Sequence, residues 1–139
     1  MRPEFVAVCN TVTTCIVYTE KCGLIHPVAT ACGQSRKIGM NEFINLNFED
    51  GVARIGVMRP QKKNALTQAM YAALADALDA AESDASINAI LLHGTDEVFS
   101  AGNDMQDFLT NFSLDESAPV VRFLHTLAAA AKPVVAAVK

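Results

Sequence analysis

The chain has 139 residues, enough for one domain of ordinary size. Hydrophobic residues make up 51% of it and charged residues 19%, a composition that can bury a core and excludes a disordered chain. The formal net charge of -4 argues against a nucleic-acid-binding protein, and no stretch approaches the about 18 consecutive apolar residues of a membrane span.

Residues 1–39 differ in composition from the rest of the chain. They hold four basic and two acidic groups, whereas residues 40–139 hold 7 basic and 13 acidic groups. They also hold all four cysteines, which are Cys9, Cys15, Cys22 and Cys32. No Cys-x-x-Cys pair occurs, so a metal module is disfavoured, although a disulfide framework is possible by count. We expect residues 1–39 to be an N-terminal extension of unknown role that is foreign to the fold, and residues 40–139 to form a folded domain.

The first predicted element of that domain is a β-hairpin over residues 42–58. Apolar and polar residues alternate on both sides of the turn sequence Glu49-Asp50-Gly51. The apolar positions are Ile44, Leu46, Phe48, Ala53, Ile55 and Val57. Arg59-Pro60 ends the hairpin because proline lacks the N–H that a strand ladder needs. A polar loop over residues 61–66 follows.

An amphipathic helix is predicted over residues 68–82. Met70, Leu74 and Leu78 recur at helical spacing, and Thr67 is a candidate N-cap. The apolar run over residues 87–93 is typical of a strand covered on both faces. Strand, helix and strand predict a right-handed βαβ crossover and therefore an α/β fold.

Three further elements are expected after a loop over residues 96–102. They are a short helix over residues 104–112, a helix that starts at an N-cap on Ser117 with Pro119 in its first turn and runs to Ala131, and a strand over residues 134–138. Because this buried-type strand is followed by Lys139 alone, we expect the chain to be a truncated part of a larger α/β fold.

Candidate chemistry is sparse outside one segment. The sequence has no nucleotide-binding glycine motif, Gly-x-Ser-x-Gly elbow or His-Glu-x-x-His motif. The histidines His26, His93 and His125 lack neighbouring partners and are expected to be structural. In residues 98–105, however, Gly102 stands just before a predicted helix start. Unpaired backbone N–H groups at such a turn can stabilise an oxyanion, and an ordinary Asn- or Asp-capped helix start is the alternative.

Three motifs in order carry a family resemblance. They are Arg59-Pro60-x-x-x-Asn64-Ala65-Leu66, Phe99-Ser100-Ala101-Gly102-Asn103-Asp104-Met105 and Lys132-Pro133-Val134-Val135-Ala136-Ala137-Val138. With the elements between them, residues 40–138 resemble the enoyl-CoA hydratase/isomerase (crotonase) superfamily, whereas residues 1–39 take no part. The resemblance implies the N-terminal half of a crotonase-like ββα spiral fold. The Ala-Gly-Asn-Asp form of the second motif is similar to Δ3,Δ2-enoyl-CoA isomerase-like members.

The resemblance implies an acyl-CoA thioester substrate from fatty acid β-oxidation, no cofactor beyond its coenzyme A moiety, and no metal. The backbone N–H of Asn103 would be the first of two oxyanion-hole donors, and Asp104 would fix the loop geometry rather than act as an acid or base. Lys62 or Lys63 would attract phosphate, and the alternative is that both are solvated loop lysines. The coenzyme-binding residues that it implies are Lys63, Ala65, Ala101, Asn103, Asp104 and Met105.

The sequence departs from the family where the second donor and the catalytic glutamates would be. Family members place them after the last strand, in and beyond Asn-Gly-x-Ala-x-Gly-Gly-Gly, and nothing in this chain matches them. We therefore expect an acyl-CoA-binding fragment that is inactive alone. The alternative is a non-catalytic CoA-binding or protein-interaction module. The resemblance further implies full-length relatives that form trimers or hexamers. From charge, hydropathy and the lack of cysteine in residues 40–139 we expect a cytoplasmic protein without nucleic-acid or membrane partners.

Overall fold

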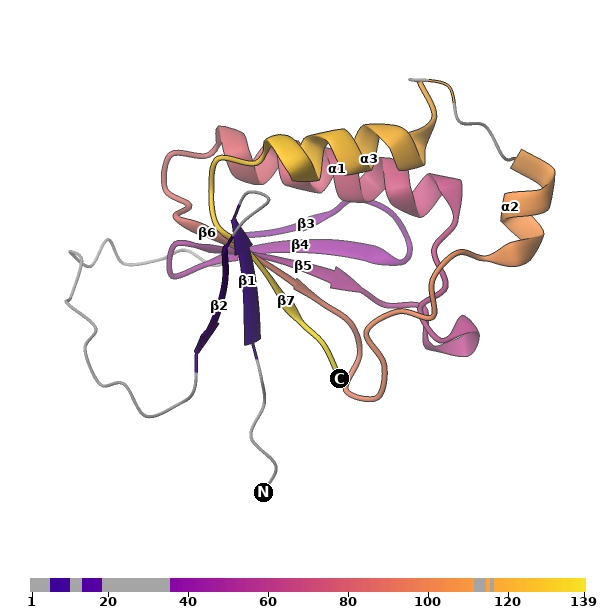
Figure 1. The fold of residues 1–139 in the computed structure, drawn as a ribbon, viewed down its shortest axis with the longest axis horizontal. Helices are drawn as coiled ribbons and strands as arrows, with labels where there is room; N and C mark the ends of the chain where they lie inside the picture. Colours follow the sequence, from indigo (N-terminus) through magenta and orange to yellow (C-terminus); the bar gives the residue numbers. More distant parts are fainter. Residues whose placement is uncertain (1–5, 11–13, 19–35, 112–114, 116) are drawn as a thin grey trace.

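The computed structural model describes residues 6–10, 14–18, 36–111, 115 and 117–139. In this part of the chain seven strands form one sheet in the order β2-β1-β7-β6-β5-β4-β3. Helices α1 and α3 lie side by side over one face of the sheet, and α2 projects beyond its end (Figure 1). The architecture is α/β, as the alternation of strand and helix patterns predicts.

The predicted hairpin is confirmed as strands β4 (Ile44–Glu49) and β5 (Val52–Val57). They pair antiparallel with Ile44 opposite Val57. At the turn, Asp50 has φ 50° and Gly51 has φ 77°, which is the left-handed pair that a two-residue hairpin loop requires. The turn with Gly51 was predicted from the sequence. The left-handed conformation of Asp50 is the second half of the same turn.

The βαβ unit is also confirmed. Helix α1 (Gln68–Ser83) begins at its predicted N-cap, where the Thr67 hydroxyl accepts a hydrogen bond from the Met70 N–H. Strand β6 (Ala89–His93) runs parallel to β5, with Gly56 opposite His93. The helix therefore crosses over the sheet between two neighbouring parallel strands.

The core lies between α1 and the sheet. Helix α1 buries one stripe, which consists of Met70, Ala73, Leu74, Ala75, Ala77, Leu78 and Ala81. Opposite it, the buried sheet residues include Ile44, Leu46, Ile55 and Ile90. The alanines bring the helix backbone close to the sheet. The prediction that β6 is covered on both faces is wrong for the described residues. Only Ile90 of this strand is buried, because the described helices lie on a single face of the sheet.

Helix α3 (Pro119–Ala129) packs along α1 and leads to strand β7 (Val134–Ala137), which is parallel to β6. Its predicted N-cap is wrong, because the helix is capped at Ala118. The N–H and hydroxyl of Ser117 instead donate to the Asp115 carboxylate, so that Ser117 belongs to the preceding turn. The short predicted helix is α2 (Met105–Asn111).

Residues 1–39 contribute three strands that the sequence did not predict. These are β1 (Val6–Asn10), β2 (Thr14–Tyr18) and β3 (Arg36–Gly39). Strand β1 pairs antiparallel with β7, and β3 pairs antiparallel with β4, so that this segment supplies both edges of the sheet. Cys22, Cys32 and His26 lie outside the described residues.

The described residues contain neither a membrane-spanning helix nor a metal-binding cluster. None of their helices combines the length and apolar character needed to cross a bilayer. No three His, Cys, Asp or Glu side chains among them gather in a way that could hold a metal ion.

Candidate functional site

Two loops meet beside the end of the sheet, one over residues 59–66 after β5 and one over residues 98–104 after β6. Because β5 and β6 are parallel, their carboxyl ends lie together, and both loops leave the sheet at that end of the strands. The Leu66 N–H donates to the Gly102 carbonyl at 2.8 Å, and the Asp104 N–H donates to the Leu66 carbonyl at 2.8 Å. A third bond joins the Ala101 N–H to the Lys63 carbonyl at 3.0 Å. We call these two segments the paired loops.

The first of the paired loops is folded tightly before it meets the second. A single 3-10 turn, η1 (Pro60–Lys62), is followed by two left-handed residues, Lys63 with φ 49° and Asn64 with φ 57°. The Asn64 N–H donates to the Arg59 carbonyl at 3.0 Å. This reversal aligns the following residues with the second loop. Asparagine tolerates the left-handed region better than most residues, so its conformation at position 64 is understandable from the sequence. Nothing in the sequence indicates that Lys63 is left-handed too.

The peptide group between Gly102 and Asn103 has a fixed orientation. Its carbonyl, on Gly102, accepts the Leu66 N–H. In a planar trans peptide the N–H points opposite to the carbonyl, so the Asn103 N–H must point away from Leu66. Among the described residues this N–H has no hydrogen-bond partner, although the N–H groups of Gly102 and Asp104 on either side are both bonded.

The space beside this peptide is open. Gly102 has φ 92°, and a Cβ placed on it would meet no atom within 4 Å. The backbone conformation, not crowding, therefore favours glycine here. Asn103 is exposed, and its side-chain oxygen is held by the Tyr71 hydroxyl at 2.6 Å. An acceptor atom of a ligand can thus approach the Asn103 N–H.

Asp104 is held by an ion pair. Its carboxylate accepts from the Arg59 guanidinium at 2.8 Å, and the two side chains are 12% and 13% exposed. The same guanidinium group donates to the Ala65 carbonyl at 2.9 Å. The other Asp104 oxygen accepts from the N–H groups of Gln106 and Asp107 and so caps α2. The hydrogen bond from Arg59 lowers the pKa of Asp104, which is therefore ionised at neutral pH and cannot donate a proton.

The structure brings the predicted site residues together. Lys63 and Ala65 lie on the first of the paired loops, and Ala101, Asn103 and Asp104 lie on the second. Met105 is the first residue of α2 and is 64% exposed. The Arg59-Pro60 motif was visible in the sequence, but the role of the Arg59 side chain was not. Its partner is 45 positions away, a separation that no local pattern reports.

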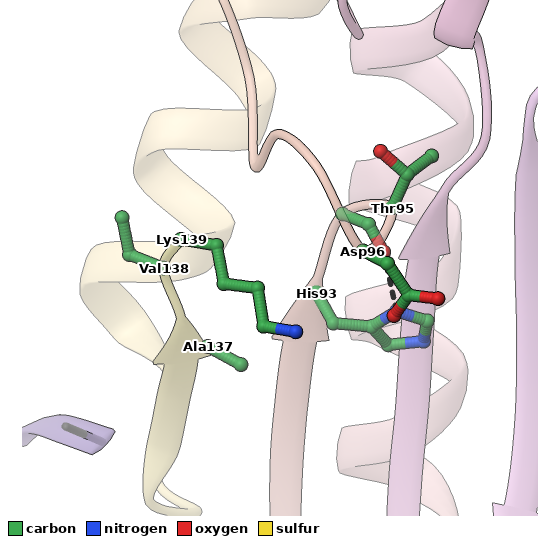
Figure 2. Close-up of a pocket in the computed structure, with 7 residues that line it drawn as sticks. His93, Thr95, Asp96, Ala137, Val138 and Lys139 are labelled. Carbon is green, nitrogen blue, oxygen red and sulfur yellow. Dashed lines mark hydrogen bonds between the residues drawn. The ribbon is translucent and has the colours of Figure 1, made fainter. Parts of the chain in front are cut away.

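A cavity of about 260 Å³ opens at the carboxyl ends of β6 and β7 (Figure 2). Ligands of open α/β sheets bind outside this end of the strands. The His93 Nδ1 lies 2.9 Å from the Gly94 carbonyl, which can only accept, so that this nitrogen carries a hydrogen. The lining residues are His93, Gly94, Thr95, Asp96, Ala137, Val138 and Lys139.

The chain's similarity to known proteins agrees with this geometry. The sequence profile of the enoyl-CoA hydratase/isomerase family matches residues 47–139. The chain therefore belongs to the enoyl-CoA hydratase/isomerase family. Human enoyl-CoA delta isomerase 2 is 40% identical over 76 residues, which are 55% of this chain and 19% of the human protein.

Solved structures agree in fold as well as sequence. OdaA of Pseudomonas aeruginosa is 40% identical with a TM-score of 0.69, over 71% of this chain and 40% of that one. An enoyl-CoA hydratase/isomerase from Pseudoalteromonas atlantica T6c is 36% identical with a TM-score of 0.64, over 70% of this chain and 39% of that one. The fold is thus crotonase-like, and the chain spans less than half the length of these relatives.

Proposed function

We propose that this chain binds acyl-CoA thioesters and that the Asn103 N–H donates a hydrogen bond to the thioester oxygen. One observation carries the proposal. The N–H of the exposed residue Asn103 is held in a fixed direction away from Leu66 and has no partner among the described residues. A preorganised donor of this kind stabilises the negative oxygen of an enolate, and its removal typically costs about 3–4 kcal/mol in activation free energy.

Coenzyme A would lie along the paired loops. Lys63, Ala65 and Ala101 lie there, although their N–H groups already bond within the loops. Lys62 and Lys63 are exposed, so their ammonium groups can approach phosphate oxygens. Met105 would add an apolar contact, since 64% of its surface is exposed. Asp104 is already bonded to Arg59, and its part is to hold the loop.

For the reaction class we propose double-bond isomerisation of enoyl-CoA. The Ala-Gly-Asn-Asp sequence and the 40% identity to a human enoyl-CoA delta isomerase support it. We also propose that residues 1–139 alone bind thioester without turnover. The paired loops contain no glutamate, and the family resemblance implies a second N–H donor that no residue of this sequence matches. A general acid or base would have to come from elsewhere.

A two-dimensional NMR titration with crotonyl-CoA tests the binding proposal. We expect the Asn103 amide resonance to shift with crotonyl-CoA, and to shift much less with free coenzyme A, which lacks the thioester oxygen. The matched variants are Asn103→Ala, which keeps the backbone N–H, and Asn103→Pro, which removes it. Tighter binding of crotonyl-CoA than of coenzyme A should persist in the first variant and disappear in the second. Equal binding of both ligands by the wild type would contradict the proposal and support the alternative of a non-catalytic CoA-binding module.

A further inference from the structure

Asn64 has an unusual environment for a loop residue. Among residues 40–111, 115 and 117–139 it is the one polar side chain that is fully buried, with 0% exposure. It is also absent from the apolar core cluster under α1. A buried carboxamide is costly unless its polar atoms are bonded, so its contacts are expected to be specific.

The Asn64 carboxamide bridges the paired loops. Its oxygen accepts from the Arg59 N–H at 2.8 Å. Its nitrogen donates to the Val98 carbonyl at 2.9 Å and to the Phe99 carbonyl at 3.1 Å. Both amide hydrogens and one oxygen lone pair are therefore used, and the side chain holds one end of each loop against the other.

The main chain of Asn64 extends this bridge toward the oxyanion donor. Its carbonyl accepts from the Ser100 hydroxyl at 2.9 Å, and that hydroxyl oxygen accepts from the Gly102 N–H at 3.1 Å. Two hydrogen bonds thus lead from Asn64 through Ser100 to Gly102, the residue whose carbonyl fixes the direction of the Asn103 N–H.

We propose that Asn64 is a positioning residue for the Asn103 N–H. Being fully buried, its side chain does not touch a ligand, and it acts by holding residues 98–102 in place. The role in binding rests on the proposed function, whereas the positioning itself is a property of the free protein. The position calls for two properties together, a left-handed backbone and a carboxamide with two donor hydrogens, and asparagine combines both.

The test is amide hydrogen exchange measured by NMR on the variant Asn64→Asp. Aspartate keeps the shape, tolerates the left-handed backbone and retains an acceptor for Arg59, but it lacks both donor hydrogens. We expect the protection of the Leu66, Ala101 and Asp104 amides to fall about tenfold or more, which is the loss of about 1.4 kcal/mol of local stability. The amides of α1 and β6 should keep theirs. Asn88→Asp is the control, because the Asn88 side chain is exposed and lies outside the paired loops.

A pH series separates positioning from a merely structural role. The buried carboxyl of Asn64→Asp should have a raised pKa, and in its protonated form it can donate one of the two lost bonds. Protection of the three loop amides, expressed relative to the intrinsic exchange rate, should therefore partly recover between pH 7 and pH 5 in this variant and stay flat in the wild type. Unchanged loop protection, or an equal loss over α1 and β6, would overturn the proposal.

A measurement on the wild type covers the case in which the variant does not fold. The two carboxamide hydrogens of Asn64 should exchange far more slowly than those of Asn88. Equal rates would also overturn the proposal. The titration with crotonyl-CoA is read separately. If the Asn103 amide resonance does not shift with crotonyl-CoA while loop protection depends on Asn64, the proposed function fails and the positioning role stands.

Discussion

The core under α1 and the paired loops are held together by different forces. The core is built from apolar side chains on α1 and the sheet, and apolar burial has no preferred direction. The paired loops are largely exposed at Ala101, Gly102 and Asn103, yet directional hydrogen bonds cross between them. The core therefore supplies stability, and the loops supply the orientation of one N–H. Substitutions in the two regions should change different observables.

The largest expected effect belongs to the core. Leu78 is 0% exposed in the centre of α1, so Leu78→Ala removes buried methyl groups and leaves a cavity. We expect the free energy of unfolding to fall by about 2–5 kcal/mol. Urea denaturation followed by circular dichroism measures it, with Glu42→Ala on an exposed site as the control. A loss confined to loop amides, without a lower urea midpoint, would contradict the division between the two regions.

Gly94→Ala should have a smaller effect that lies mainly in the second loop. A Cβ on Gly94 would come within 2.3 Å of the Val98 carbonyl oxygen and 2.5 Å of the Phe99 Cα, so the backbone must move. Strain of this kind typically costs about 1–3 kcal/mol. Since Asn64 donates to the Val98 and Phe99 carbonyls, we expect the protection of loop amides to fall more than that of core amides.

Gly102→Ala is the matched comparison for Gly94→Ala. A Cβ on Gly102 would meet no atom within 4 Å, but the residue has a φ of 92°. The alanine variant should therefore lose about 1–2 kcal/mol of stability through backbone conformation alone. Hydrogen exchange on both variants would show whether crowding or backbone conformation limits the second loop. Equal and uniform losses over the whole chain in both variants would remove the distinction.

The core was largely predictable from the sequence, and the bracing of the loops was not. Alternating apolar residues gave β4 and β5, and the spacing of Met70, Leu74 and Leu78 gave α1, because amphipathic periodicity is local. The site motif was visible at Ala101 to Asp104. The bond from Asn64 to Val98 was not visible, because a contact across 34 positions depends on the fold.

The errors have physical reasons too. Ser117 looks like an N-cap in sequence, but Asp115 competes for its hydroxyl and N–H. Strand β6 reads as covered on both faces because its residues are apolar, whereas in the structure only Ile90 is buried and the other four residues of the strand are partly exposed. The strands of residues 1–39 pair through backbone atoms at the sheet edges, and such pairing needs little side-chain pattern.

Acidification should loosen the loops before the core is affected. The pKa of Asp104 lies below its ordinary value of 3.8 because Arg59 donates to the carboxylate. A carboxyl group with a lowered folded-state pKa stabilises the fold above its unfolded value, and this contribution disappears as pH falls through the folded-state pKa. We expect loop protection to be constant above about pH 4 and to decline below it. In Asp104→Asn that decline should be absent, with lower protection at neutral pH.

The smallest effect is expected on α2, which directly follows the second loop. Leu109 is 79% exposed, so Leu109→Gln removes no buried contact in this chain. Stability should change by no more than about 0.5 kcal/mol, and loop protection should not change, because the cap of α2 comes from Asp104 rather than from apolar packing. Urea denaturation and hydrogen exchange measure both. A loss above 1 kcal/mol would mean that this helix face is covered in solution, and sedimentation velocity of the wild type would then show whether a second copy covers it. In that case apolar burial would also stabilise the neighbourhood of the site, and the division between core and loops would hold only for the isolated chain.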